Sequence, residues 1–274
     1  MRILPYVVLA FLLPPVMAAP ASREYKLILD SGALKSEQAA DIAAKVERTL
    51  QNLAGEKLSI VSRVKSMRDK SRTVRFIDTP GDCLLRQAGL IVRDRGDEKK
   101  RAVTLKLRGR GSEDWARHWQ LKEEEDVTPP LQVTSSRSLS SKIPVATPLK
   151  TVADLLEYFP ALAGLKLPTG KAVQSILQED IREETFTLPQ FKLGSRWSET
   201  ELSIWYFGRE TQPGLIEVSF RYEVDPADDA VTRALAERWF TLWQGASGLP
   251  VSGAETTKTA HVFRRAAGFC QVNP

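Results

Sequence analysis

The chain has 274 residues, of which 42% are hydrophobic, so it is long enough to bury one sizeable core. Its 39 Lys and Arg residues against 34 Asp and Glu give a formal net charge of +5, and the two signs are interspersed along the chain. This distribution disfavours a nucleic-acid-binding protein, while the modest positive excess is compatible with an anionic ligand.

The chain begins with MRILPYVVLAFLLPPVMAAP, in which one Arg is followed by an apolar run that two prolines interrupt. This pattern is typical of a secretory signal peptide, with cleavage expected after Ala18. A retained N-terminal anchor is the alternative, but the prolines shorten a stretch already short for spanning a bilayer. We therefore expect residues 1–18 to be a leader and residues 19–274 to form a single domain. That domain is expected to be exported, periplasmic or secreted, with no membrane span after cleavage.

Cys83 and Cys270 are the only cysteines. In an exported protein they predict one disulfide between the C-terminal tail and the centre of the chain, two unpaired thiols being the alternative. A metal site on these cysteines is disfavoured, because the two histidines, His118 and His261, do not lie at ligand spacing from them.

The first half of the chain reads mainly as strands. Residues 24–29 alternate polar and apolar side chains, which predicts a strand, and residues 36–53 repeat apolar residues at helical spacing. A charged turn is expected at 68–72 and one helical turn at 83–88. Further strands are predicted at residues 59–67, 73–78, 90–95, 102–108 and 117–127.

Residues 128–148, rich in Pro, Ser and Thr, predict a linker or long loop. Asp225 and Pro226 form a start signal for an amphipathic helix that Gly245 ends. The other elements predicted in this half are a helix at 149–159, strands at 173–188, 201–207 and 215–224, and a last helix at 255–267.

Charged and apolar side chains alternate in four of these strands. In residues 102–108, for example, Thr104, Lys106 and Arg108 share one face because successive strand side chains point to opposite sides. An open sheet with one solvated face would explain each strand separately. If the predicted helices cover the apolar faces of a closed barrel, however, the charged faces turn inward. Basic residues facing one another repel unless an anion or acidic side chains lie between them, so we expect a polyanionic ligand.

Several segments also match, in order, the motifs of one known group of proteins. They are Glu24-Tyr25-Lys26, the turn at 76–80, the leucine-rich stretch at 84–95 that ends in Arg-x-Arg, and Val103-Thr104-Leu105-Lys106. Together these motifs resemble the CYTH superfamily, the triphosphate tunnel metalloenzymes, which includes class IV adenylyl cyclases, thiamine triphosphatases and inorganic triphosphatases.

The resemblance implies an α+β fold, a closed antiparallel eight-stranded β-barrel or tunnel with helices packed on the outside. It also implies that basic side chains bind a phosphate-rich small-molecule anion, a triphosphate or polyphosphate, while carboxylates hold Mg²⁺ or Mn²⁺. No catalytic residue is assigned. The expected phosphate-binding residues are Lys26, Arg93, Arg95, Lys106, Arg108, Arg182, Arg221 and Lys258, and the expected metal ligands are Glu24, Glu217 and Glu223.

Three departures from the family pattern weaken the expected metal site. Ser22 and Ser219 stand where the family has acids, and Trp205 stands near a usual aspartate. The remaining acids either hold one ion or form internal salt bridges with neighbouring Lys and Arg. The acidic run at 123–126 reads as a solvated strand end, with a metal site as the minor alternative.

Three functions are therefore open. The first is a metal-dependent triphosphatase or polyphosphatase, with Lys26, Arg93, Arg95, Lys106 and Arg182 neutralising phosphate charge. The second is a catalytically degenerate protein that binds a polyanion without metal chemistry. The third is an envelope scaffold whose protein partner is unknown, with loop 128–148 and the aromatic residues near Trp205 as its contact surface.

Overall fold

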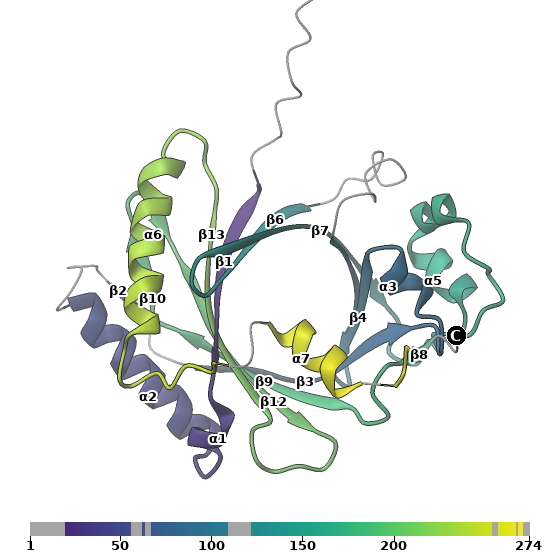
Figure 1. The fold of residues 1–274 in the computed structure, drawn as a ribbon, viewed down its shortest axis with the longest axis horizontal. Coiled ribbons are helices and arrows are strands. Elements are labelled where there is room, and N and C mark those ends of the chain that lie inside the picture. The colour runs from purple at the N-terminus through teal and green to yellow at the C-terminus, as the bar shows by residue number, and fades with distance from the viewer. Residues whose placement is uncertain are drawn as a thin grey trace, which may run out of the picture.

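A computed structural model describes residues 20–55, 62–63, 67–108, 122–253, 257–266 and 268–270 (Figure 1). The expected leader at residues 1–18 lies outside these ranges. The principal strands are β1 (Ser22–Leu29), β3 (Met67–Asp78), β4 (Leu90–Gly96), β5 (Arg101–Arg108), β6 (Lys122–Thr128), β7 (Gln132–Ile143), β9 (Ile181–Leu188), β12 (Glu199–Phe207) and β13 (Leu215–Glu223).

These strands form a closed, mixed β-barrel. Their order is β4-β5-β7-β6-β1-β13-β12-β9-β3, and the pairing of β3 with β4 closes the ring, while the short β8 (Gln174–Ser175) pairs only with β3. The ring thus has nine strands among the described residues. Because an odd ring cannot be antiparallel throughout, one parallel pair is required, and β1 with β6 supplies it. The predicted α+β barrel with outer helices is confirmed, but its strand count and purely antiparallel pairing are corrected.

The strand that raises the count is β7, which lies in the region predicted as a linker. It pairs with β5 on one side and with β6 on the other. Its sequence, QVTSSRSLSSKI, alternates small polar residues with longer ones, and Thr104 Oγ1 lies 2.8 Å from Ser140 Oγ across the β5–β7 pair. Serine-rich composition suggested a loop, but small hydroxyl side chains also suit a strand that faces a polar interior.

The other differences in secondary structure are local. β3 runs unbroken through residues 68–72, so the turn predicted there is wrong. The strand predicted at 173–188 is divided between β8 and β9, and part of the strand predicted at 59–67 is β2 (Ser62–Arg63). The patterns missed the helix α1 (Ser31–Leu34) and two short strands, β10 (Gln190–Leu193) and β11 (Arg196–Trp197).

Two helices cover the outer face of β1, β12 and β13. The predicted helix at 36–53 is α2 (Ala39–Leu53), and the one after Pro226 is α6 (Asp229–Gln244) (Figure 1). The apolar row of β1 packs beneath them, and the ring centroids of Tyr25 and Phe220 are 4.7 Å apart. Phe220 in turn meets Trp243 of α6 edge-on, at 4.9 Å between ring centroids. Burying these faces under helices leaves the opposite, polar faces pointing into the barrel.

A second apolar cluster lies over the outer faces of β4 and β5. The helix α5 (Val152–Tyr158) and the 3₁₀ helix η2 (Pro160–Leu165) cover it with Leu155, Phe159 and Leu162. Thr151 caps α5 by accepting a hydrogen bond from the Asp154 amide, and the Asp154 carboxylate accepts one from the Thr151 amide in return. In the described part of the chain, no helix combines the length and the apolar character needed to cross a membrane.

The C-terminal helix α7 (Lys258–Arg265) is tied back to the barrel. Cys270 forms a disulfide with Cys83, 187 residues earlier in the chain, which confirms the predicted bond. Cys83 lies between β3 and α3 (Leu84–Gln87), in the turn that the Asp78 carboxylate organises by accepting hydrogen bonds from three backbone amides. The helical turn predicted at 83–88 is thereby confirmed.

Candidate functional site

The strand faces that point inward line a polar cavity of about 640 Å³ inside the barrel. We call this cavity the tunnel. Every wall strand contributes to the lining, and most contribute at alternate positions, as the two-residue period of a strand predicts. Among its lining residues, basic side chains outnumber acidic ones. The charged members are Lys26, Arg72, Arg93, Arg95, Lys106, Arg108, Lys122, Arg221 and Lys258 on the basic side, and Glu24, Glu124, Glu183, Glu199, Glu201 and Glu217 on the acidic side.

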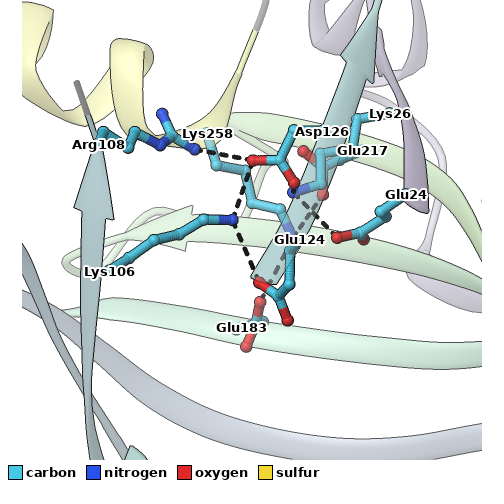
Figure 2. Close-up of polar contacts among 9 residues, drawn as sticks. All are labelled: Glu24, Lys26, Lys106, Arg108, Glu124, Asp126, Glu183, Glu217 and Lys258. Carbon is cyan, nitrogen blue, oxygen red and sulfur yellow. Dashed lines mark hydrogen bonds and ion pairs between the residues drawn. The ribbon is translucent and has the colours of Figure 1, made fainter. Parts of the chain in front are cut away.

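Asp126 on β6 holds the first group of tunnel cations together (Figure 2). Its carboxylate accepts hydrogen bonds from Lys26 Nζ at 2.8 Å, Lys106 Nζ at 2.9 Å and Arg108 Nη2 at 3.1 Å. Burial alone would raise the pKa of Asp126, but the two ammonium groups outweigh it and hold that pKa well below its usual range. One buried carboxylate therefore accepts hydrogen bonds from three cations on two other strands.

Glu24 adds a second carboxylate beside the same cluster. Its Oε2 lies 2.9 Å from Lys26 Nζ. Burial opposes ionisation of Glu24, yet the ammonium of Lys26 lowers its pKa overall. The pKa of Lys106 is lowered, first by burial and then by repulsion from Lys26. Lys106 nevertheless has two carboxylates near it, Asp126 at 2.9 Å and Glu124 at 3.6 Å from its Nζ.

Acidic residues gather on the opposite wall, where β9, β12 and β13 lie side by side. Glu183 Oε2 accepts a hydrogen bond from Arg72 Nε at 2.5 Å, while its Oε1 accepts from Ser203 Oγ at 2.9 Å and Trp205 Nε1 at 2.8 Å. Lys258 Nζ lies 2.9 Å from Glu217 Oε1 and 3.7 Å from Glu183 Oε1 (Figure 2). We call Glu183, Glu201 and Glu217 the acidic wall.

Arg93 and Arg95 lie two residues apart on β4. Both point into the tunnel from β4, and among the described residues neither has an ion pair or a side-chain hydrogen bond. Burial, followed by the nearby Arg72, lowers the pKa of Arg93 despite the attraction of distant carboxylates. The charge of Arg93, burial and Arg72 lower the pKa of Arg95 to about 9. The positive potential of the tunnel is therefore concentrated at β4.

One end of the tunnel is apolar. Along each of several strands the inward side chains change from polar to apolar, as from Glu201 to Trp205 on β12 and from Glu217 to Leu215 on β13. Val262 of α7 packs against this apolar end. Figure 1 looks along the barrel and shows α7 across part of its opening, so the helix narrows that end.

Most residues predicted from the sequence do meet in the tunnel. Seven of the basic ones, together with Glu24 and Glu217, line it. Two predictions of position are corrected. Arg182 lies on the outer face of β9, with its guanidinium 3.9 Å from the ring centroid of Tyr206 and its charge paired with Glu184. Glu223 is exposed at the end of β13 and does not line the tunnel.

The sequence patterns missed several charged residues of the site. Arg72 was assigned to a turn, and Asp126 belongs to the acidic run that read as a solvated strand end. Glu183 and Glu201 lie on strands where both faces carry polar residues, so alternation does not show which face is internal. Arg182 was predicted to face the tunnel, but the residue that lines the cavity is its neighbour in the sequence, Glu183.

A divalent metal does not fit the described residues as they are arranged. No group of three or more His, Cys, Asp and Glu side chains among them converges closely enough to hold an ion. Two of the three acids expected to bind metal are instead engaged by a cation, Glu24 by Lys26 and Glu217 by Lys258, and the third, Glu223, lies outside the tunnel. Glu24 and Glu217 thus act as counter-ions, which was the alternative that the sequence left open.

Several solved structures are similar to this one along most of their length. A candidate adenylyl cyclase from Hippeastrum, with a dominant triphosphatase activity, shares 16% identity over 88% of this chain and 94% of its own, with a TM-score of 0.48. Candidate adenylate cyclases from Bacillus halodurans and Vibrio parahaemolyticus each share 13% identity, with TM-scores of 0.42 and 0.37. These two matches cover 89% and 90% of this chain and 99% of each of theirs.

At such low identity the likeness concerns the fold alone. No protein-family model matches the chain, and no curated protein matches it in sequence.

Proposed function

We propose that the tunnel binds a phosphate-rich small-molecule anion, a triphosphate or an inorganic polyphosphate. The observation that carries this proposal is the pair Arg93 and Arg95, which face the cavity without an acidic partner among the described residues. Bringing two guanidinium groups together costs free energy unless an anion lies between them. A bound phosphate would supply the missing charge.

The shape and chemistry of the tunnel favour phosphate over other anions. A guanidinium presents a planar fork of N–H donors that matches phosphate oxygens, whereas lysines act as point charges. Here both types occur along a single cavity, with Arg93 and Arg95 on β4, Lys106 and Arg108 on β5, and Arg221 on β13. Cations spread over several strands suit an extended anion with several phosphates better than a single phosphate group.

Metal-dependent phosphohydrolysis is the second candidate. It is favoured by Glu24 and Glu217, which stand in the same cavity as the cations. Mg²⁺ and Mn²⁺ require oxygen ligands that are free to coordinate them, and here Lys26 and Lys258 already engage those two carboxylates. Binding without metal chemistry therefore agrees better with the geometry than hydrolysis does.

Calorimetry with tripolyphosphate tests the first proposal. The titration is run once with a chelator and once with Mn²⁺, on the natural protein and on the double variant Arg93→Gln/Arg95→Gln. We expect saturable binding that survives the chelator and is lost in the double variant. An Arg75→Gln variant is the matched control, since Arg75 is exposed and pairs with Asp180 outside the tunnel. No binding to the natural protein would refute the proposal and favour the scaffold function.

The same samples test hydrolysis. If the tunnel only binds, tripolyphosphate incubated with the protein and Mg²⁺ or Mn²⁺ should release no phosphate above the buffer rate. Release that a chelator abolishes and that Arg93→Gln/Arg95→Gln lacks would instead establish the metal-dependent hydrolase.

We also propose that the protein is exported, to the periplasm or out of the cell. The leader pattern at residues 1–18 and the disulfide between Cys83 and Cys270 both favour an oxidising compartment. Sequencing the N-terminus of the protein from the extracytoplasmic fraction tests this. Export predicts a mature chain that starts at Ala19, and a full-length chain confined to the cytoplasm would contradict it.

A further inference from the structure

Lys258 reaches into the tunnel from a helix outside the barrel wall. It is the first residue of α7, and the Thr257 side chain caps that helix by accepting a hydrogen bond from the Ala260 amide. Its ammonium lies 2.9 Å from Glu217 Oε1, 3.7 Å from Glu183 Oε1 and 5.3 Å from the ring centroid of Trp205. The cation thus contacts two carboxylates from different strands, as a bound metal ion would.

We propose that the Lys258 ammonium is a built-in replacement for a divalent cation at the acidic wall. It supplies the positive charge that Glu183 and Glu217 need, so the tunnel is complete without metal. It follows that the anion binds without metal, and this consequence rests on the proposed function. The replacement of the metal ion by Lys258 does not depend on whether an anion binds.

The donors around Glu183 support this assignment. Ser203 Oγ and Trp205 Nε1 donate to its Oε1, and Arg72 Nε donates to its Oε2. A metal ion needs lone pairs that point at it, but the two donors on Oε1 occupy both of its lone pairs, and Arg72 occupies one of the two on Oε2. An arriving ion would also meet the positive charge of Arg72 at short range. The acidic wall is therefore built around N–H and O–H donors.

Other contacts keep α7 in place, so the position of Lys258 is fixed in advance. Val262 is buried against the apolar end of the tunnel, and Arg265 pairs with Glu179 and Glu210 on the outside. Beyond the helix, Cys270 is joined to Cys83. The Lys258 side chain is only 15% exposed, which distinguishes it from a solvated surface lysine.

The test is Mn²⁺ binding in the absence of phosphate, followed by electron paramagnetic resonance. Three variants are compared with the natural protein. Lys258→Met removes the charge and keeps the length, Lys258→Arg keeps the charge, and Arg265→Gln removes a charge from the same helix outside the tunnel. We expect Lys258→Met to bind Mn²⁺ at least about tenfold more tightly than the natural protein, because the change frees Glu217 Oε1, a hard oxygen ligand, and removes a positive charge that repels the ion. Lys258→Arg and Arg265→Gln should bind no better than the natural protein.

Two results would overturn the replacement. One is Mn²⁺ binding to the natural protein as tight as to Lys258→Met, and the other is a folded Lys258→Met variant with no gain. If Lys258→Met does not fold, the Mn²⁺ affinity of the natural protein is the deciding measurement. A dissociation constant below about 100 μM, which is in the range of protein carboxylate sites, contradicts the proposal. Weaker binding supports it.

The experiments can reject the replacement of the metal by Lys258 and the proposed anion binding independently of each other. A gain of Mn²⁺ binding in Lys258→Met without any tripolyphosphate binding by the natural protein would keep the replacement and reject the anion site. Tripolyphosphate binding that requires Mn²⁺ in the natural protein would do the reverse.

Discussion

Arg93 and Arg95 lie two residues apart on β4 and face the same cavity, where the charge of Arg93 is the main cause that lowers the pKa of Arg95 to about 9. Successive inward positions on one strand bring like charges close together. Folding therefore holds these two cations in an arrangement that opposes stability. Such an arrangement is expected where a ligand of opposite charge completes the site.

Replacing Arg95 with Gln should change stability and ligand affinity in opposite senses. Without the second charge, repulsion in the free tunnel falls and the thermal unfolding midpoint should rise. Affinity for tripolyphosphate should fall about tenfold or more, since a hydrogen bond to a charged group contributes roughly 1.5–3 kcal/mol. Differential scanning fluorimetry and calorimetry measure the two effects, with Arg75→Gln as the control outside the tunnel. A loss of both stability and affinity would mean that Arg95 is a structural residue.

The depressed pKa of Arg95 also predicts how binding depends on pH. In the free protein Arg95 loses its proton as the pH rises through about 9, well below the usual range for arginine. A bound phosphate favours the charged form, so binding above that pH must take up a proton and affinity must fall as the pH rises further. Calorimetry in two buffers of different ionisation enthalpy measures this uptake. The Arg95→Gln variant corrects for titration of the ligand, and equal uptake in both proteins would refute the prediction.

Replacing Asp126 with Asn should destabilise the free protein and strengthen anion binding. The change leaves Lys26, Lys106 and Arg108 around a neutral amide, and breaking a buried ion pair in this way costs about 3–5 kcal/mol. A phosphate chain would then find cations without their counter-ion. Urea denaturation with and without tripolyphosphate tests this, because the ligand should recover more stability in the variant than in the natural protein. Glu124→Gln is the milder comparison, since Glu124 Oε2 lies 3.6 Å from Lys106 Nζ.

How much of this structure the sequence predicts depends on whether one face of an element is apolar. Strands such as β1 and β5 were recognised because their outer residues, Tyr25 or Leu105 for example, must lie under helices while the others face the tunnel. β7 lacks such an apolar row, since it packs mostly through small hydroxyl residues such as Ser138 and Ser140. Composition then favoured a loop, and the strand that makes the ring odd was missed.

The residues of the site differ in the same way in whether the sequence predicts them. Lys106 and Arg93 stand on strands with a clear apolar face, so the sequence assigns them to the tunnel. Glu183 does not, because Arg182 and Glu184 beside it are also charged, and only the pairing with β12 and β3 decides which side is internal. The sequence also does not predict which charged residues pair with each other. The contacts of Asp126 with three cations from two other strands follow from the strand order β5-β7-β6-β1, which no residue pattern shows.

Removing the disulfide should loosen α7 before it loosens the barrel. The bond between Cys83 and Cys270 closes a loop of 187 residues, and losing such a bond typically costs about 2–5 kcal/mol. In the double variant Cys83→Ser/Cys270→Ser, the helix is held by noncovalent contacts alone, among them the burial of Val262, the surface pairs of Arg265 and the contacts of Lys258 with Glu217 and Glu183. Amide hydrogen exchange should therefore quicken at residues 258–265 and stay slow in β1 and β13, whose outer faces lie in the core under α2 and α6. A uniform increase over the whole barrel would show instead that the bond stabilises the fold as one unit. Unchanged exchange in α7 would show that the noncovalent contacts of the helix are sufficient to hold Lys258 in the tunnel.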